Sequence, residues 1–254
     1  GEGLGNKFLG NIRECNAILH VLRCFDDPNV VHVDGKVDPV RDKEIIDTEL
    51  QLKDLESVES KMKRYEKLAK TGSDKEAVKT YNALAKVKAV LESGQSARAA
   101  GLEDNERPFV DDLHLLTIKP VLYVCNVDEA SAKTGNAYVE AVKEAVKNEQ
   151  AGILVITAQM ESEIAALETY EEKQMFLADM GLDEPGVNKL IKEAYALLEL
   201  ETYFTAGEKE VRAWTIRKGT KAPGAAGVIH SDFEKGFIRA ETYHCEDLFQ
   251  LGSE

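Results

Sequence analysis

The sequence predicts an α/β protein that carries an inserted helical hairpin and ends in a smaller, β-containing module. Three observations favour this fold class. Short apolar runs recur along the chain, amphipathic segments with helical periodicity lie between them, and short strand-like segments follow residue 200. A chain of 254 residues is long enough for one large domain or for two to three small ones.

The composition is that of an ordinary soluble globular protein, with 43% hydrophobic and 31% charged residues. No apolar run reaches the ~18 residues of a membrane span, and no signal-peptide pattern opens the sequence. We therefore expect a cytoplasmic protein that has no membrane partner. The four cysteines form no CxxC pair and the five histidines show no metal-binding spacing, so we predict no disulfide framework and no metal site within this chain.

Three apolar runs, at residues 17–22, 120–125 and 152–157, are too short for helices and do not alternate with polar residues. This pattern is typical of parallel strands that are buried on both faces. The amphipathic segment 136–149 lies between the second and third runs and predicts a helix. The three segments together therefore predict a strand–helix–strand unit in a parallel sheet.

Between the first and second runs, apolar residues recur every three to four positions over two neighbouring segments, 43–70 and 74–93. Ser73, with Glu76 three positions later, matches a capping box that opens the second helix. The two segments predict an antiparallel helical hairpin whose apolar stripe forms its packing core.

The formal net charge of −14 is spread unevenly. Residues 61–88 of the hairpin carry nine Lys or Arg against three acidic residues, and residues 209–221 carry five against one around Trp214. Each basic stretch is either a solvated face or a contact surface for RNA, and the pattern alone leaves both interpretations open. We expect no DNA sequence specificity. The candidate RNA contacts are Lys61, Lys63, Arg64, Lys67, Arg212, Arg217 and Lys218.

The segment after residue 200 predicts a small β-rich or α+β module. Residues 202–205, 211–216 and 237–243 have the composition of strands. The intervening PGAAG at 223–227 predicts a loop.

The most informative polar turn is 126–129 (Asn-Val-Asp-Glu), which directly follows the strand predicted at 120–125. Ligands of open parallel sheets bind outside the carboxyl ends of the strands. An asparagine there offers a donor and an acceptor to a nucleobase, and a carboxylate three positions later can accept from an exocyclic amine. Alone, the Asn-x-x-Glu pattern is a weak signal that an ordinary strand-to-loop turn also explains. Its position after a buried strand, with the next strand ending in Thr157-Ala158, strengthens the nucleotide interpretation. By composition alone, His32 is more typical of a packed or surface histidine than of a catalytic one.

Four blocks of the sequence closely resemble the YchF family of Obg-like ATPases, and the match runs along nearly the whole chain in the family's order. The blocks are GEGLGNKFLGNIRE (1–14), LHVLRCFDDPNVVHVDGKVDPVRDKEIIDTELQLKDLE (19–56), KPVLYVCNVDE (119–129) and TYFTAGEKEVRAWTIRKGTKAPGAAGVIHSDFEKGFIRAE (202–241). The resemblance implies a P-loop G-domain formed by residues 1–40 and 109–200. It also implies an inserted coiled-coil domain at 41–108 and an incomplete, β-grasp-like TGS domain at 201–254.

No GxxxxGK[ST] sequence occurs in the 254 residues. The resemblance implies that the family's phosphate-binding loop, its Mg²⁺-binding Ser/Thr and its DxxG switch precede Gly1, and that the last TGS strands follow Glu254. We therefore expect a fragment of a longer protein. Because the groups that hold the phosphates and Mg²⁺ would be missing, we expect residues 1–254 alone to be unable to hydrolyse nucleotide.

The family's NxxE motif, which replaces the NKxD of related GTPases, falls on residues 126–129. Loss of the Lys/Asp arrangement removes the preference for guanine and implies ATP, with Asn126, the main chain around Val127, and Glu129 at the base. Thr157 and Ala158 fall where related proteins have a second base-contacting loop. His32 aligns with the family's catalytic histidine, which places or activates the attacking water, and this implication reverses the interpretation from composition alone.

The resemblance thus implies a ribosome-associated switch that binds and hydrolyses ATP with Mg²⁺, and whose basic surfaces contact ribosomal RNA. Two alternatives stay open. One is a non-enzymatic module in which the coiled coil and the TGS domain bind RNA or protein. The other is the use of GTP instead of ATP.

Overall fold

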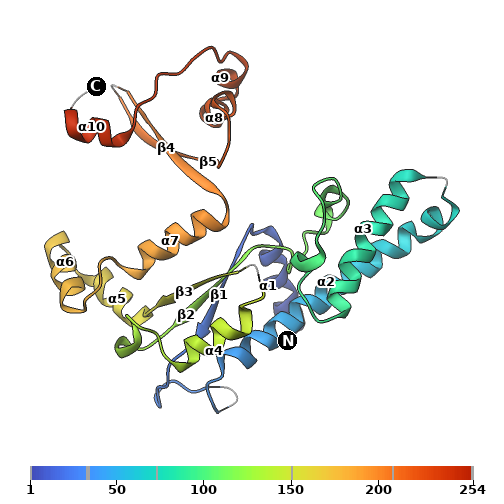
Figure 1. The fold of residues 1–254 in the computed structure, drawn as a ribbon, viewed down its shortest axis with the longest axis horizontal. Helices are drawn as coiled ribbons and strands as arrows, with labels where there is room; N and C mark the ends of the chain where they lie inside the picture. The colour runs from blue at the N-terminus through green and yellow to red at the C-terminus, as the bar shows by residue number, and fades with distance from the viewer. Residues whose placement is uncertain (1, 33–34, 73, 150, 208, 253–254) are drawn as a thin grey trace. The chain divides into compact units, whose positions relative to one another are not determined.

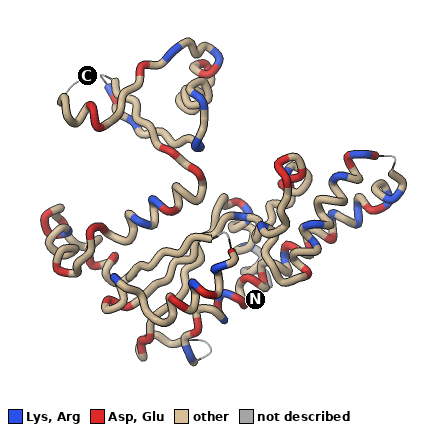
Figure 2. The backbone as a smooth tube through the Cα atoms, in the orientation of Figure 1, with Lys and Arg blue, Asp and Glu red and all other residues tan. Residues whose placement is uncertain are grey.

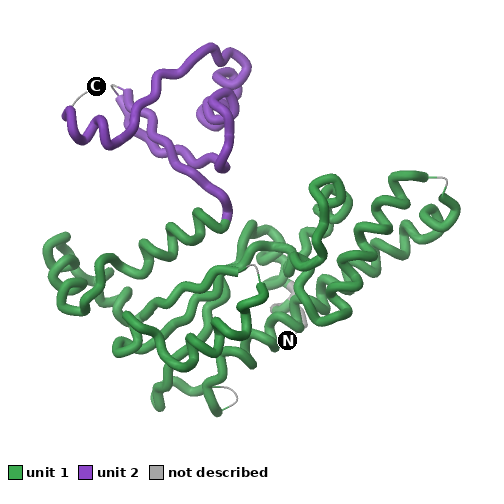
Figure 3. Tube along the Cα trace, viewed as in Figure 1, with its two compact units in different colours: residues 1–197 green, residues 198–254 purple. Residues whose placement is uncertain are grey.

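The computed structural model describes residues 2–32, 35–72, 74–149, 151–207 and 209–252, and it forms two compact units, residues 1–197 and 198–254 (Figure 3). The first unit contains the parallel sheet and the hairpin (Figure 1). No described helix is both long enough and apolar enough to cross a membrane. The finer division of the first unit near residues 40 and 108 stays a prediction.

The sheet of the first unit has three parallel strands in the order β1–β2–β3 (Figure 1). These strands are β1 (Ile18–Arg23), β2 (Val121–Asn126) and β3 (Gly152–Ile156), so all three predicted strands and their parallel pairing are confirmed. Asn126 pairs with Arg23 on one side and with Ile156 on the other. The loops that carry the candidate site residues therefore leave the sheet at the same edge.

The central strand β2 is buried on both faces, as its apolar run predicts. On one face, Tyr123 and Cys125 pack with Val139 and Val142 of α4 (Ala137–Val146). On the other face, Leu122 and Val124 pack against α7 (Gly186–Leu197). Besides the two helices of the hairpin, this unit also contains the described helices α1 (Glu2–Glu14), α5 (Ala158–Ala166) and α6 (Tyr170–Asp179). Its short 3-10 turns are η1 (Ala97–Ala100), η2 (Arg107–Phe109), η3 (Asp111–Leu113) and η4 (Glu129–Ser131).

The hairpin consists of α2 (Pro39–Thr71) and α3 (Lys75–Glu92), which lie side by side (Figure 1). Apolar residues of the two helices pack together in one cluster. Asp38 caps the first helix, and proline follows it at the first helical position, where the missing N–H removes no hydrogen bond. Asp74 caps the second helix by accepting from two backbone N–H groups. The capping box predicted from Ser73 and Glu76 is therefore wrong in its cap residue, and Ser73 itself lies outside the described residues.

Asp54 of α2, whose side chain is fully buried, fixes the hairpin to the segment that leads back to the sheet. Its carboxylate accepts hydrogen bonds from the backbone N–H groups of Leu116 (2.8 Å) and Thr117 (2.7 Å) and from the Thr117 hydroxyl (2.7 Å). Burial raises the pKa of Asp54, although these three donors oppose the rise. The joint satisfies backbone donors that would otherwise be orphaned in the interior.

A second polar joint holds the base of α2 against the sheet. The buried Lys43 ammonium lies 2.7 Å from both Asp47 and Glu149, and the Tyr123 hydroxyl donates to Glu149 (2.8 Å). Burial opposes the charged form of Lys43, but the hydrogen bonds to the two carboxylates raise its pKa overall. Nearby, burial lowers the pKa of His20.

The second unit contains β4 (Leu200–Ala206) and β5 (Val211–Arg217), which pair antiparallel, followed by α8 (Ala222–Ile229), α9 (Ser231–Lys235) and α10 (Cys245–Leu251). The first two predicted strands are confirmed. The loop predicted at 223–227 is wrong, because Pro223 lies in the first turn of a helix, where proline is well tolerated. The strand predicted at 237–243 is also wrong, since none of the described strands pairs with this segment.

Candidate functional site

The turn after β2 is joined to the start of α5 by Asn126, the last residue of the strand. Its Oδ1 accepts a hydrogen bond from the backbone N–H of Ala158 at 2.9 Å. That N–H is one of the donors that a helix leaves unsatisfied at its N-terminus. Asn126 is half-buried, and its Nδ2 makes no hydrogen bond within the part of the chain that the structure describes. The side chain therefore presents a fixed donor at the carboxyl edge of the sheet.

The next residues shape the turn. The N–H of Val127 donates to the carbonyl of Ile156 (2.9 Å), so this part of the main chain extends the sheet and does not offer a free donor. Asp128 accepts from the N–H of Ser131 (2.9 Å) and thereby caps η4. Glu129 is the first residue of that short turn, and it is exposed. A ligand at this edge can reach the Glu129 carboxylate.

Thr157 and Ala158 lie directly beside this turn, as the sequence predicts. Thr157 is buried, and its hydroxyl points to the carbonyl of Asp128 at 3.5 Å. A cavity of about 20 Å³, lined in part by Thr157, lies between α5 and the start of α7. It has room for about one water molecule, so a nucleobase would rest on the outside of the turn.

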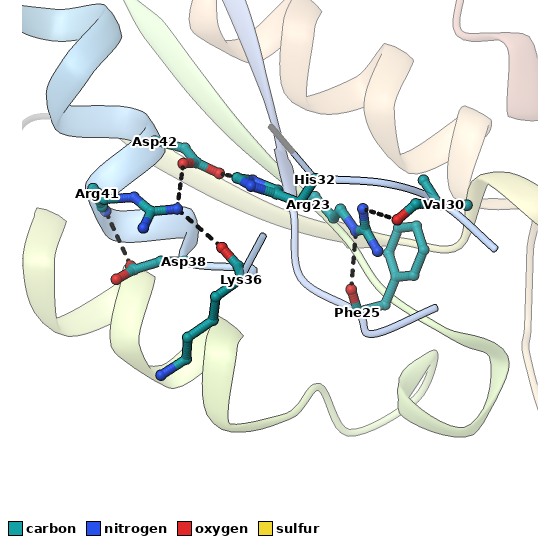
Figure 4. Close-up of polar contacts among 8 residues, drawn as sticks. All are labelled: Arg23, Phe25, Val30, His32, Lys36, Asp38, Arg41 and Asp42. Carbon is teal, nitrogen blue, oxygen red and sulfur yellow. Dashed lines mark hydrogen bonds and ion pairs between the residues drawn. The ribbon is translucent and has the colours of Figure 1, made fainter. Parts of the chain in front are cut away.

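His32 lies in the loop that follows β1 and contacts the first turn of α2. Its Nε2 lies 2.9 Å from Oδ2 of Asp42, and its side chain is 16% exposed (Figure 4). The same loop is folded by Arg23, which donates to the carbonyls of Phe25 (3.1 Å) and Val30 (2.9 Å). A histidine that is paired with a carboxylate has a defined orientation, which a surface histidine lacks.

The predicted RNA contacts on the hairpin divide into two groups. Lys61 is buried, and its ammonium contacts the carbonyl of Phe109 (2.7 Å) and the carboxylate of Asp112 (2.5 Å). We therefore remove Lys61 from the candidate surface, because its side chain is buried and its ammonium is already paired with Asp112. The other three residues of α2 are exposed: Lys63, Arg64 and Lys67. Figure 2 shows that Lys and Arg recur along both helices of the hairpin.

In the second unit, the three predicted RNA contacts all lie at or beside β5 and are exposed. The Arg212 guanidinium stacks over the Trp214 ring at 4.2 Å, and the indole N–H donates to Thr205 (2.9 Å). Arg217 and Lys218 follow at the end of the strand. The aromatic ring is thus half-buried beneath a cation instead of being presented for base stacking.

Sequence reasoning missed Asp42 and Asn136. Asn136 caps α4, and its amide donates to the carbonyl of Cys24 (2.7 Å), which ties the loop after β1 to the segment after β2. Asp42 follows His32 by ten residues, and the cap-and-proline signal at residues 38–39 places it in a first helical turn. Within the described residues, no group of three or more His, Cys, Asp or Glu side chains is arranged to hold a metal ion.

Comparison with known proteins finds relatives that carry YchF or Obg-like names. A family model for the C-terminal region of YchF GTPases, described as a protein of unknown function (DUF933), matches residues 200–254. The ribosome-binding ATPase YchF of Bacillus subtilis is 54% identical over 254 residues, covering 99% of this chain and 69% of that protein. Obg-like ATPase 1 of Gallus gallus is 43% identical over 258 residues, covering 100% of this chain and 65% of that protein. The structure of the Schizosaccharomyces pombe YchF GTPase matches with a TM-score of 0.87 at 37% identity, covering 100% of this chain and 69% of that one.

These relatives show a nucleoside-triphosphate hydrolase of the P-loop class, and the parallel sheet agrees with that fold. Within that class, the chain belongs to the YchF/Obg-like ATPase family.

Proposed function

We propose that this chain is part of an ATP-binding and ATP-hydrolysing switch that associates with the ribosome. In this proposal, the turn at 126–129 and residues Thr157 and Ala158 receive the adenine base, and His32 orients the attacking water. Relatives that are 54% and 50% identical are named ribosome-binding ATPases, which supports both the nucleotide and the partner. Mg²⁺ would accompany the triphosphate, as it does in P-loop nucleotide hydrolases generally.

The observation that carries the nucleotide proposal is the hydrogen bond from Ala158 N–H to Asn126 Oδ1. It commits the oxygen of the amide to the protein and leaves Nδ2 as the donor of this side chain for a ligand. Adenine offers ring nitrogens that accept such a donor, and its exocyclic amine can donate to the exposed Glu129 carboxylate. Removing the side chain of Asn126 would also remove the acceptor for the first N–H of α5. The turn after β2 and the start of α5 would then no longer be held together by this hydrogen bond.

The base proposal is tested by titrating the ¹⁵N-labelled chain with ATP and, separately, with GTP. We expect ATP to shift the amide resonances of residues 126–129, 157 and 158 more strongly than GTP does. Asn126→Ala should weaken the ATP response by at least about tenfold, which corresponds to roughly 1.4 kcal/mol. Asn82→Ala changes an exposed asparagine on α3 and serves as the matched control. A stronger response to GTP would overturn the adenine assignment.

The ribosome proposal rests on the exposed cations of α2. Neutralising Lys63, Arg64 and Lys67 together should reduce the dependence of ribosome affinity on salt, since each phosphate contact contributes about 0.7–0.9 to the slope of log K against log salt. Three lost contacts would reduce this slope by roughly 2–3. Co-sedimentation with ribosomes over a salt series measures the change.

The hairpin offers a matched control with the same change in charge. Lys70, Lys86 and Lys88 each form an ion pair within the protein, with Glu66, Glu106 and Glu59 respectively. Replacing these three lysines by alanine should change the salt slope much less, because their charges already face protein carboxylates. Equal effects of the two triple variants would refute a specific contact surface. Ribosome binding that is tight but insensitive to ATP would favour a non-enzymatic binding module.

A further inference from the structure

We propose that Asp42 is a positioning residue that fixes the ring orientation and the tautomer of His32. The inference deepens the proposed function and rests on the role assigned there to His32. It assigns to the first turn of the hairpin helix α2 a part in the hydrolytic step, although the rest of that helix lies in the inserted hairpin.

The geometry defines which nitrogen is engaged. Asp42 Oδ2 lies 2.9 Å from His32 Nε2, which is the length of a normal hydrogen bond. A carboxylate only accepts, so Nε2 carries the proton. In the neutral ring the other nitrogen, Nδ1, is then an acceptor. A histidine held in this form has one defined donor nitrogen and one defined acceptor nitrogen instead of a mixture of tautomers.

Asp42 is itself held in place (Figure 4). Its backbone N–H donates to the carbonyl of Asp38 (3.0 Å), as part of the capped start of α2. Its second carboxylate oxygen, Oδ1, lies 3.4 Å from Nη2 of Arg41, and the same Nη2 donates to the carbonyl of Lys36 (2.9 Å). The two oxygens therefore have separate contacts, one with the guanidinium and one with the imidazole.

This division of contacts distinguishes a positioning role from a simple surface ion pair. The Asp42 side chain is 29% exposed and that of His32 is 16% exposed, so solvent competes only in part for the bond. If the ring were released, it could rotate or shift its proton to Nδ1, and either change would alter which ring nitrogen donates and which accepts. General-base and water-orienting groups depend on such geometry before they depend on their pKa.

The direct test uses the 254-residue chain and needs no enzymatic turnover. In a chain with ¹⁵N-labelled histidine at about pH 8, where an ordinary imidazole is neutral, NMR distinguishes the protonated ring nitrogen from the unprotonated one. We expect His32 to carry its proton on Nε2. Asp42→Asn should produce a mixture of tautomers or the Nδ1–H form, because an amide can also donate to the ring. Glu44→Gln, an exposed change on the same turn, should leave the tautomer unaltered.

Turnover provides the second readout, measured in a protein that joins these residues to a phosphate-binding loop. We expect Asp42→Asn to reduce kcat about 10- to 100-fold while the KM for ATP stays within about twofold. Asp42→Glu keeps a carboxylate and should recover part of the loss. His32→Ala should abolish turnover.

The two hypotheses fail in different ways. Full turnover in the His32→Ala protein would remove His32 from the proposed function, and the inference would fall with it. If that protein is inactive but Asp42→Asn retains both the original tautomer and the original kcat, the inference is wrong and the proposed function stands. Far-UV circular dichroism of each variant shows whether α2 still forms.

Discussion

The most direct test of how the hairpin is fixed to the rest of the first unit is Asp54→Ala. The wild-type carboxylate is fully buried and accepts three hydrogen bonds of 2.7–2.8 Å, two of them from the backbone of Leu116 and Thr117. Alanine removes all three acceptor contacts and leaves the donors buried without partners. Hydrogen bonds to a charged group contribute about 1.5–3 kcal/mol each, which sets an upper limit of roughly 9 kcal/mol.

The net loss must be smaller, because burial opposes the charged form of Asp54 and that penalty disappears in the variant. We therefore expect the free energy of unfolding to fall by about 3–5 kcal/mol, as is usual when one member of a buried, hydrogen-bonded set is removed. For a unit of this size, the fall corresponds to a decrease in Tm of roughly 6–20 °C.

The assay can separate the two units. Trp214 is the only tryptophan of the sequence and lies in β5 of the second unit, so its fluorescence reports that unit. Helical circular dichroism reports mainly the first. In a urea titration, Asp54→Ala should shift the dichroism transition and leave the fluorescence transition in place. Glu49→Ala, an exposed change on the same helix, should shift neither. A loss below about 1 kcal/mol for Asp54→Ala would refute the reasoning.

Three further predictions concern the joints of the first unit, each measured by urea unfolding. Lys43→Met should reduce stability by about 2–4 kcal/mol, because two carboxylates lose their shared cation; no measurable loss would contradict this. Burial lowers the pKa of His20 below 6.5, so the unfolded chain binds more protons than the folded chain as the pH falls below that value. The free energy of unfolding should therefore decrease over this pH range, and His20→Gln should make the decrease smaller. Glu161→Ala should reduce stability by about 1–2 kcal/mol, since its carboxylate accepts from two N–H groups at the start of α7 (2.6 and 3.1 Å), whereas the exposed Glu163→Ala should have little effect.

Local sequence pattern predicts the strands and the hairpin because it records which side chains are buried. The apolar run at 120–125 becomes a strand buried on both faces, and the helical periodicity of 43–93 becomes α2 and α3. At 223–227 the same approach fails, because a proline is a loop signal in one position and a good first-turn residue in another. The resemblance to a known family implies roles for individual residues, but it does not predict the side-chain contacts that support those roles.

Long-range contacts account for what was missed at the site. Lys61 looks like one more cation of a basic face, yet a segment 48 residues later folds back and buries it. His32 lies in a loop and Asp42 in the helix that follows it, and hydrophobic periodicity does not predict the course of a loop. The bond between Asn126 and Ala158 joins two strand ends, and it follows from the parallel register once that register is known.

The two polar joints of α2 also limit how the hairpin can act on the site. The helix is continuous from Pro39 to Thr71, so at about 1.5 Å per residue its exposed cations near Lys67 lie roughly 38 Å along the axis from Asp42. Lys43 and Asp54 fix the helix between these two points. Bending of the free end alone would leave Asp42 in place, because both joints lie nearer the base. A contact at the tip can therefore alter the orientation of His32 only if it displaces the helix at these buried joints. If His32 has the role proposed above, weakening these joints would couple the hairpin to hydrolysis.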